Sequence, residues 1–108
     1  MVEYIQVFTT VDSRQSADTI AKSMVEKRLV ACAQITGPIT STYRWEGQIE
    51  TADEWLLIMK TRVDLYAELE KNIKEMHSYD VPEILAVPVI AGNSSYLDWV
   101  AKETGLGE

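Results

Sequence analysis

The chain has 108 residues, which fits one domain built around a single hydrophobic core of modest size. Its formal net charge of −7 at pH 7 repels phosphate backbones, so nucleic acid is not an expected partner. No run of about 18 apolar residues is present, and the N-terminal segment lacks a basic region and a small-residue cleavage site, so we expect neither a membrane span nor a signal peptide.

The chain begins with a predicted strand and a predicted amphipathic helix. Residues 2–10 are rich in β-branched and aromatic side chains, a composition typical of a strand. Asp12 and Gln15 have the spacing of a capping box, in which two side chains satisfy free backbone N–H groups at a helix start. The apolar side chains that follow recur on one helical face, which predicts a helix packed on a sheet. These side chains are Ala17, Ile20, Ala21, Met24, Val25 and Leu29.

Two long strands joined by a tight turn follow this helix. Residues 30–45 and 48–61 predict the strands, and Gly47 in the turn can adopt a positive φ without a Cβ clash. We expect the first of these strands to break near Gly37 and Pro38. Each strand has about 14–16 residues, against about 5–6 in a typical strand. Helices cannot cover that length, so the outer half of the hairpin should protrude.

The protruding part of the hairpin predicts self-association. Its edges carry unpaired backbone groups, which invite pairing with another chain. It also carries apolar side chains that are costly to leave in water, namely Ile39, Tyr43, Trp45 and Ile49. We therefore expect this arm to pack on neighbouring copies of the chain.

The second half of the chain predicts a helix, a strand and a terminal helix. Residues 63–77 form an amphipathic pattern. Its core stripe consists of Tyr66, Leu69, Ile73 and Met76. Pro82 disfavours helix at the residue before it, and residues 84–90 predict a fourth strand. Asn93 or Ser94 can cap the last helix. Its packing face includes Tyr96, Leu97, Trp99 and Val100.

The predicted order, β-α-β-β-α-β followed by a helix, is the split βαβ pattern of ferredoxin-like α+β domains. We expect one such domain over residues 1–108, with both inner helices on one face of the sheet. In this arrangement the fourth strand lies at a sheet edge. Pro88 within that strand agrees, because proline donates no ladder hydrogen bond and is tolerated chiefly at edges.

Several segments resemble the CutA divalent-cation tolerance family, and together they cover nearly the whole chain in the family's order. The hairpin and the His-x-Tyr-x-x-Pro-Glu segment are the more specific of them. The segments lie at residues 26–35, 41–49, 59–61, 77–84, 88–89 and 96–99. They read EKRLVACAQI, STYRWEGQI, MKT, HSYDVPEI, PV and YLDW.

The resemblance implies a ferredoxin-like fold, a homotrimer similar in architecture to the PII signalling proteins, and a role in tolerance to divalent metal ions, copper above all. It implies no reaction, and the chain has no phosphate loop, CxxC pair or zinc-ligand spacing, so we do not expect an enzyme. The implied copper ligands that match here are His77 and Glu83. The family's third ligand, a cysteine near the end of the first strand, is replaced, since Thr9 stands about where the thiol would be.

Three roles are open for His77, namely metal ligation, a structural role at a helix end and, ranked last, acid/base catalysis together with Lys60 and Glu83. Imidazole and carboxylate suit Cu(II) or Zn(II), and His77 with Glu83 supplies two of the three or four ligands that a site needs. Water or a neighbouring subunit would supply the others. The alternative is structural, because a histidine at the C-terminal end of a helix is favoured by the helix dipole.

A second set of residues predicts a cleft between subunits. The resemblance implies that polar and aromatic side chains line such a cleft. The candidates are Tyr43, Trp45, Glu50, Lys60, Tyr79 and Glu83. Lys60 follows four apolar residues, so its ammonium group must reach water or meet a carboxylate such as Glu50 or Glu83. The cleft is either a packed interface with salt bridges, or a pocket for an anion or metabolite in a PII-like signalling module.

The remaining candidates are structural. Cys32 lies in an apolar strand and is expected to be a buried, inert thiol. A single cysteine cannot form an internal disulfide, which suits a reducing compartment, so we expect a cytoplasmic protein. Trp55 and Trp99 are expected to anchor the core or an interface.

Overall fold

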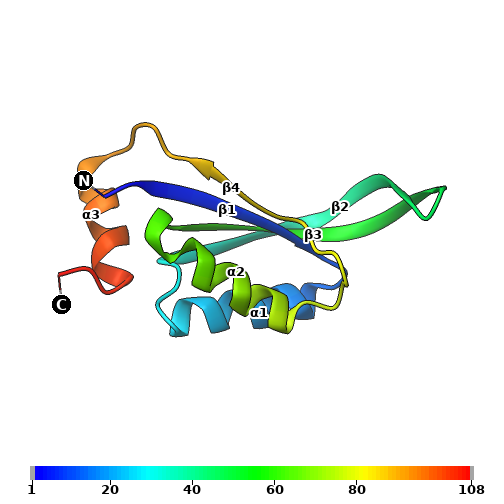
Figure 1. The fold of residues 1–108 in the computed structure, drawn as a ribbon, viewed down its shortest axis with the longest axis horizontal. Coiled ribbons are helices and arrows are strands. Elements are labelled where there is room, and N and C mark those ends of the chain that lie inside the picture. Colours follow the sequence, from blue (N-terminus) through cyan, green and yellow to red (C-terminus); the bar gives the residue numbers. More distant parts are fainter. Residues whose placement is uncertain (1, 108) are drawn as a thin grey trace.

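Within residues 2–107, which the computed structural model describes, the chain forms a four-stranded sheet and three α-helices in the predicted order (Figure 1). The elements are β1 (Tyr4–Val11), α1 (Arg14–Glu26), β2 (Cys32–Trp45), β3 (Gln48–Arg62), a 3₁₀ turn (Val63–Leu65), α2 (Tyr66–Met76), β4 (Ile84–Pro88) and α3 (Ser94–Glu103). The sheet order is β2-β3-β1-β4, and neighbouring strands pair antiparallel. This arrangement confirms the ferredoxin-like α+β prediction, with β4 and its Pro88 at a sheet edge.

The hydrophobic core lies between the sheet and the helices α1 and α2, which cover the same sheet face (Figure 1). From Tyr4 to Thr9, burial along β1 alternates with the period of a strand, with Ile5, Val7 and Thr9 buried, and the last two residues of the strand are buried as well. Strand β3 adds Leu57 and Met59, which are fully buried in the same layer. The helices contribute Ala17, Ile20, Ala21, Met24, Leu69 and Ile73.

Some predicted boundaries were wrong by a few residues. Helix α1 is capped by Ser13 and not by Asp12, and the Ser13 hydroxyl accepts a hydrogen bond from the Ser16 backbone N–H at 3.0 Å. The reason is that β1 continues one residue further than predicted, so the chain turns later. Leu29 enters the core from the turn after α1 and does not belong to the helix. The predicted helix at 63–77 begins with a 3₁₀ turn and ends one residue earlier.

The hairpin of β2 and β3 extends past the two helices at one end of the molecule (Figure 1). Its ladder shifts register between Thr36 and Ile39, at the predicted break. Glu46 and Gly47 in the turn have φ of 50° and 80°, a conformation that matches the twist of the flanking strands. Near the tip, Ile49 is 68% exposed, as expected for a protruding arm.

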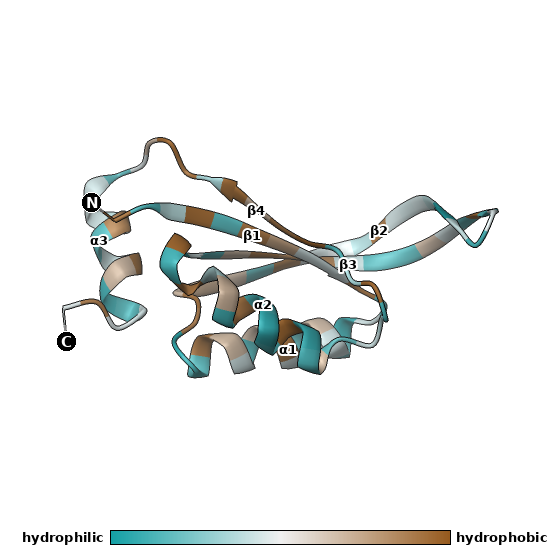
Figure 2. Cartoon of the chain, viewed as in Figure 1, coloured by the Kyte–Doolittle hydropathy of each residue, from teal (hydrophilic) through white to brown (hydrophobic). Residues whose placement is uncertain are grey.

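On the sheet face opposite α1 and α2, the part along β4 is apolar and exposed. This part lies away from α3. Figure 2 shows β4 and the segment after it as hydrophobic. Leu85 and Val87 of β4 are exposed, and Ile90 beyond the strand is 95% exposed. An apolar row on an edge strand is a feature of surfaces that pack against another chain. Self-association itself stays a prediction, because the structure describes a single chain.

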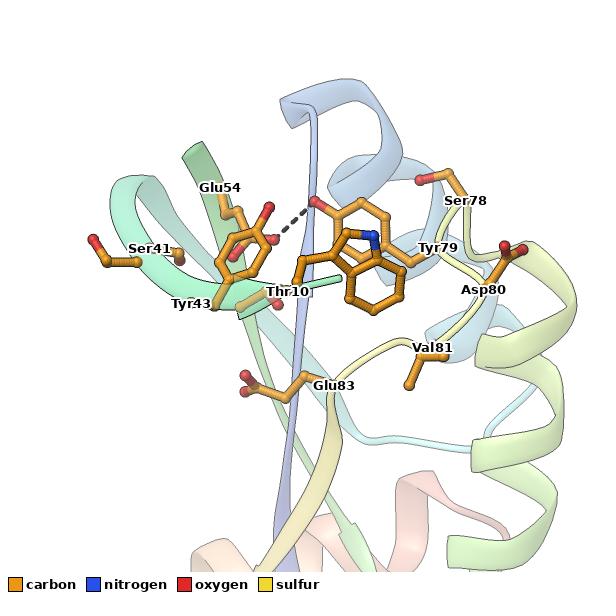
Figure 3. A pocket seen from close by; sticks show the side chains of 11 residues that line it. Thr10, Ser41, Tyr43, Glu54, Ser78, Tyr79, Asp80, Val81 and Glu83 are labelled. Atoms are coloured by element: carbon orange, nitrogen blue, oxygen red, sulfur yellow. Dashed lines mark hydrogen bonds between the residues drawn. The ribbon is translucent and has the colours of Figure 1, made fainter. Parts of the chain in front are cut away.

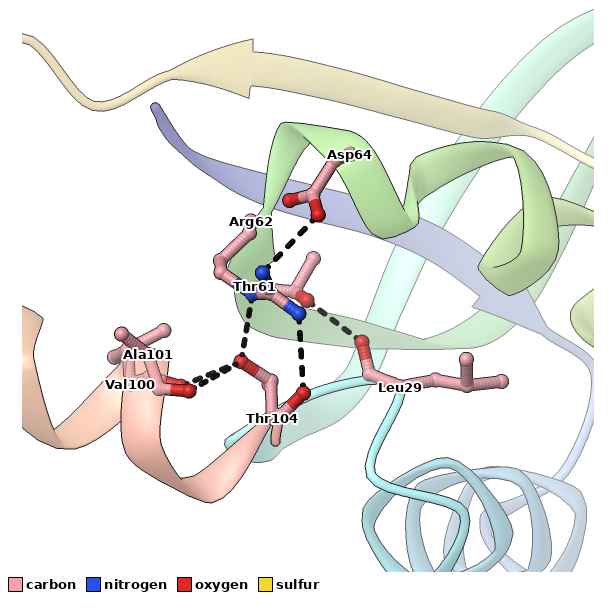
Figure 4. A network of polar contacts seen from close by, with 7 residues as sticks. All are labelled: Leu29, Thr61, Arg62, Asp64, Val100, Ala101 and Thr104. Carbon is pink, nitrogen blue, oxygen red and sulfur yellow. Dashed lines mark hydrogen bonds and ion pairs between the residues drawn. The ribbon is translucent and has the colours of Figure 1, made fainter. Parts of the chain in front are cut away.

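Arg62 at the end of β3 joins α3 to the sheet (Figure 4). Its guanidinium donates hydrogen bonds to the Thr104 hydroxyl at 3.0 Å, to the Thr104 carbonyl at 3.1 Å and to the Asp64 carboxylate at 3.0 Å. Asn93 caps the start of α3 as predicted, by accepting a hydrogen bond from the Tyr96 backbone N–H. Neither α3 nor any other helix within residues 2–107 is long and apolar enough to cross a membrane.

Candidate functional site

A cavity of about 700 Å³ lies between the outer half of the β2–β3 hairpin and the loop of residues 77–83, which joins α2 to β4. Its lining consists of Thr10, Ser41, Thr42, Tyr43, Trp45, Glu54, Ser78, Tyr79, Asp80, Val81 and Glu83. Figure 3 shows the hairpin side chains on one side of this pocket and those of the loop on the other. The lining includes three carboxylates and three aromatic rings, and it contains no lysine, arginine or histidine.

Strand pairing directs the hairpin side chains into the pocket. Ser41, Tyr43 and Trp45 alternate along β2 and therefore share one face of the hairpin. Glu54 of β3 pairs with Ile39 of β2, and directly opposed residues point to the same face. The register of the hairpin therefore brings a carboxylate to the aromatic side chains.

Glu54 and Tyr79 form the polar centre of the pocket. Glu54 is only 6% exposed, and the Tyr79 hydroxyl donates a hydrogen bond of 2.8 Å to its carboxylate (Figure 3). Burial, and then the hydrogen bond and negative charge of Glu54, raise the pKa of Tyr79 above its ordinary value of 10.0. Within residues 2–107 Glu54 has no ion pair, so its carboxylate lacks a cationic partner in this part of the chain.

The raised pKa of Tyr79 predicts a loss of stability at high pH. Below pH 10.0, the ordinary pKa, the phenol is protonated in both states and its contribution is constant. Above that value the unfolded chain loses this proton first, so the folded state binds more protons and the free energy of unfolding falls. In Tyr79→Phe, urea unfolding should show a smaller fall between about pH 10 and about pH 11.5 than in the wild type. Tyr4→Phe, outside this pocket, is the control, and equal falls in all three proteins would contradict the prediction.

His77 uses both ring nitrogens to hold the start of the 77–83 loop. Its Nδ1 accepts a hydrogen bond from the Tyr79 backbone N–H at 3.1 Å. This assigns the ring proton to Nε2, which donates to the Thr10 carbonyl at 2.9 Å. The imidazole therefore has partners on both sides within the chain, and it must give up one of them before it can bind a metal ion.

The predicted metal pair of His77 and Glu83 is not completed by further ligands within one chain. Glu83 lines the pocket, whereas His77 lies outside its lining. Among residues 2–107, no group of three or more His, Cys, Asp or Glu side chains is arranged to hold one ion. Thr9, at the position implied for the family's cysteine, is fully buried, and its hydroxyl has no hydrogen-bond partner. One chain alone therefore offers an incomplete ligand set.

Lys60 does not meet Glu50 or Glu83 in this chain, although both were predicted as possible partners. Its ammonium group donates to the side-chain carbonyl of Gln34 on the neighbouring strand β2. It lines a second cavity of about 170 Å³, which shares no residue with the pocket. The reason is the strand register, because Lys60 lies near the base of the hairpin and Glu50 lies near its tip, outside the lining of the pocket.

The residues predicted to be structural have different environments. Cys32 is half-buried and not fully buried as expected, and its Sγ lies 3.5 Å from the Tyr96 hydroxyl. Burial and this hydrogen bond raise the pKa of Tyr96 to about 12. Trp55 packs against the core, as predicted. Trp99 is 41% exposed beside the Tyr96 ring, so within one chain it is not a core residue.

The sequence analysis did not predict seven of the lining residues as site residues, and Thr10, Glu54 and Asp80 are among them. For Glu54 a signal existed, since the two-residue period of a strand places it on the opposite face from the buried Leu57. Thr10 ends the predicted first strand, but no residue near it in the sequence indicates which side chains lie beside it in the fold. Asp80 resembles any solvated loop carboxylate.

Comparison with known proteins supports the resemblance found in the sequence. Residues 5–103 match the family model described as CutA1 divalent ion tolerance protein. The chain belongs to the CutA1 family. The divalent-cation tolerance protein CutA of Thermus thermophilus is 46% identical over 99 residues, which cover 92% of this chain and 96% of the relative.

Solved CutA1 structures have the same fold as this chain. The structure from Thermus thermophilus has a TM-score of 0.90 at 45% identity, and the match covers 97% of this chain and 100% of that one. CutA1 from Shewanella sp. SIB1 has a TM-score of 0.93 at 34% identity, and the match covers 95% of this chain and 96% of that one. These likenesses confirm the ferredoxin-like prediction.

Members of the CutA1 family are named for different compartments. The chloroplastic protein CutA of Arabidopsis thaliana is 40% identical over 103 residues, which cover 95% of this chain but 57% of that longer protein. The CutA structure from Archaeoglobus fulgidus is described as periplasmic. It is 40% identical with a TM-score of 0.91, and the match covers 94% of this chain and 98% of that one. The family alone therefore does not fix a cytoplasmic location.

Proposed function

We propose that this CutA1 chain acts in tolerance of divalent metal ions as a cytoplasmic homotrimer that binds Cu(II) or another divalent ion directly. The observation that carries the proposal is the acidic pocket, whose lining holds Glu54, Asp80 and Glu83 and no cationic side chain. A concave site with one sign of charge concentrates ions of the opposite sign. The divalent-cation tolerance named for the Thermus and Archaeoglobus relatives agrees with this proposal.

A second copy of the chain would complete the ion site. One chain does not gather three ligands, and His77 has to release a hydrogen bond before it can coordinate. Association is supported by the exposed apolar side chains Trp45, Ile49, Leu85, Val87 and Ile90. In a closed trimer these surfaces become buried, and a neighbour's carboxylate, imidazole or bound water can add to Glu83.

Calorimetric titration of the metal-free protein with Cu(II) at about pH 7 tests this function. A weak competing chelator is needed, because Cu(II) heads the divalent affinity order and binds most accessible histidines. We expect about one ion per chain with a sub-micromolar Kd, and an affinity lowered about tenfold or more in Glu83→Gln and in His77→Ala. Glu75→Gln makes the same change in charge at an exposed position of α2, outside the lining, and should bind like the wild type.

Each arm of this experiment can contradict the proposal. Equal affinity in Glu83→Gln and wild type would show that the ion does not bind in the pocket. Unchanged affinity in His77→Ala would show that His77 is not a ligand. Thermal unfolding of His77→Ala separates a lost ligand from the lost hydrogen bonds of the loop. Light scattering at micromolar concentration should give the mass of a trimer, and a single-chain mass would overturn the assembly.

A PII-like ligand-binding module is the second candidate function, and the size of the pocket favours it. Its volume of about 700 Å³ falls in the range typical of small-molecule sites, about 300–1,000 Å³. Aromatic side chains and a few polar groups line it, as in such sites. Thermal-shift screening should find a ligand that stabilises the fold by about 2.7 kcal/mol at 100 times its Kd. No shift with any class of metabolite would contradict this candidate.

A further inference from the structure

We propose that the Lys60 side chain of one copy of the chain enters the pocket of a neighbouring copy and forms an ion pair with the Glu54 carboxylate there. This pairing rests on the association of chains in the proposed function, and it fixes how two copies meet. Asp80 and Glu83 of the same lining stay available to the proposed ion.

The sheet has a second apolar face, opposite α1 and α2. Phe8 of β1 lies between Ile58 of β3 and Leu85 of β4, so a row of three apolar side chains crosses this face. Leu85 is 59% exposed, and Phe8 and Ile58 are half-buried. A sheet that is apolar on both faces needs a packed layer on each of them. The helices α1 and α2 supply one layer, and we infer that a second copy of the chain supplies the other.

Glu54 and Lys60 lie on this second face, far apart along β3. Leu57 and Met59 are buried toward the helices, and the side chains of a strand alternate, so Glu54 and Lys60 point to the other side. At about 3.3 Å per residue, the two positions are about 20 Å apart, which is too far for an ion pair within one chain. Two copies that meet head to tail bring Lys60 of one copy to Glu54 of the next.

Neither of these charges has a partner of opposite charge within residues 2–107. Glu54 is only 6% exposed, and its carboxylate accepts a hydrogen bond from the uncharged Tyr79 hydroxyl. Lys60 is half-buried and donates to the uncharged side-chain carbonyl of Gln34. Burial of a carboxylate without a cation is costly, and a charge-assisted hydrogen bond from an ammonium group offsets that cost. The face therefore carries complementary charges, and this complementarity favours a second copy as its occupant.

The other cations on the strands cannot take the place of Lys60. Arg44 alternates with the pocket residues of β2, so it points to the hairpin face away from the pocket. Arg62 is buried, and its guanidinium is engaged in the hydrogen bonds that join α3 to the sheet (Figure 4). Among the strands within residues 2–107, Lys60 is thus the cation that lies on the face of the pocket without a charged partner.

Head-to-tail pairing repeats around a closed ring, because each copy gives one Lys60 and receives another at Glu54. Leu56 and Ile58 lie between the two charges on β3, so the same contact covers these apolar side chains. It also covers the outer hairpin, where Trp45 is 46% exposed in a lone chain. One contact therefore accounts for the open apolar face and for the uncompensated charge of Glu54.

Subunit exchange between isotope-labelled and unlabelled full chains, followed by native mass spectrometry, tests the ion pair. Lys60→Met keeps most of the apolar stem, and Glu54→Gln keeps the shape of the side chain, so both remove charge with little change in packing. We expect each variant to exchange at least about tenfold faster than the wild type, because loss of one partner leaves a buried charge unpaired. The double variant should exchange no faster than the faster single variant, because the second change removes no remaining pair.

Three further variants separate the pair from other effects. Lys60→Arg keeps the positive charge and should exchange within about threefold of the wild type. Lys74→Met and Glu75→Gln make the matched changes at exposed positions of α2, on the other side of the sheet, and should exchange like the wild type.

The outcomes distinguish this pair from the proposed function. Unchanged exchange in Lys60→Met or Glu54→Gln, effects that multiply in the double variant, or exchange in Lys60→Arg as fast as in Lys60→Met would each overturn the pair alone. A wild type with the mass of a single chain would overturn the proposed association together with the pair. Exchange is measured on the metal-free protein, so a failure to bind Cu(II) would leave its result unchanged.

Discussion

Replacing Leu57 with alanine is expected to lower the free energy of unfolding by about 2–5 kcal/mol. Leu57 is fully buried in β3, and it pairs with Thr9 on one side and with Ile35 on the other. Its side chain therefore lies at the centre of the layer between the sheet and the helices. Because β3 is hydrogen-bonded along both edges, the backbone cannot move to fill the space that alanine leaves.

Urea unfolding at fixed protein concentration measures this effect. The concentration must be fixed because association would add to the apparent stability. Val25→Ala on the exposed side of α1 is the control and should change stability by no more than about 0.5 kcal/mol. A loss below about 1 kcal/mol in Leu57→Ala would contradict the central position of this side chain in the core.

Replacing Arg62 with methionine is expected to release α3 from the sheet and to cost about 2–4 kcal/mol. Arg62 is buried, and two of its three hydrogen bonds go to Thr104, just beyond the end of α3 (Figure 4). Methionine keeps most of the apolar stem, so the variant removes the charged donors with little change in packing. The Thr104 carbonyl then loses its donor in a buried place, which adds to the cost.

Hydrogen exchange of the α3 amides measures this release. In Arg62→Met we expect α3 (Ser94–Glu103) to lose protection while β1 and β3 keep theirs. Asp64→Asn is the control, because the Asp64 side chain is 61% exposed and its ion pair with Arg62 contributes at most about 1 kcal/mol. Unchanged protection of α3 in Arg62→Met would show that apolar contacts alone hold this helix.

The fold was predictable because its signals are local. The stripe of Leu69 and Ile73 marked a helix, and the β-branched and aromatic side chains of β1 marked a strand. Pro88 then indicated which strand lies at an edge. Errors occurred where two local signals competed, as when Ser13 and not Asp12 became the cap because β1 continued further.

The candidate site was predictable only in part. Tyr43, Trp45, Tyr79 and Glu83 were predicted to share a cleft, and all four line one pocket of this chain. Whether that pocket lies between subunits stays a prediction. Lys60 was grouped with them because of its chemistry, although its place at the end of β3 far from the turn already put it at the base of the hairpin.

By itself, the sequence determined the order of helices and strands, the long hairpin with its turn, and the family, since periodicity and turn residues act over a few positions. Only the tertiary structure decided the chemistry of the pocket. The hydrogen bond between Tyr79 and Glu54 joins residues 25 apart, and that between His77 and Thr10 joins residues 67 apart. Such contacts depend on the register of several strands, and a slip of one residue turns every side chain of a strand to the other face.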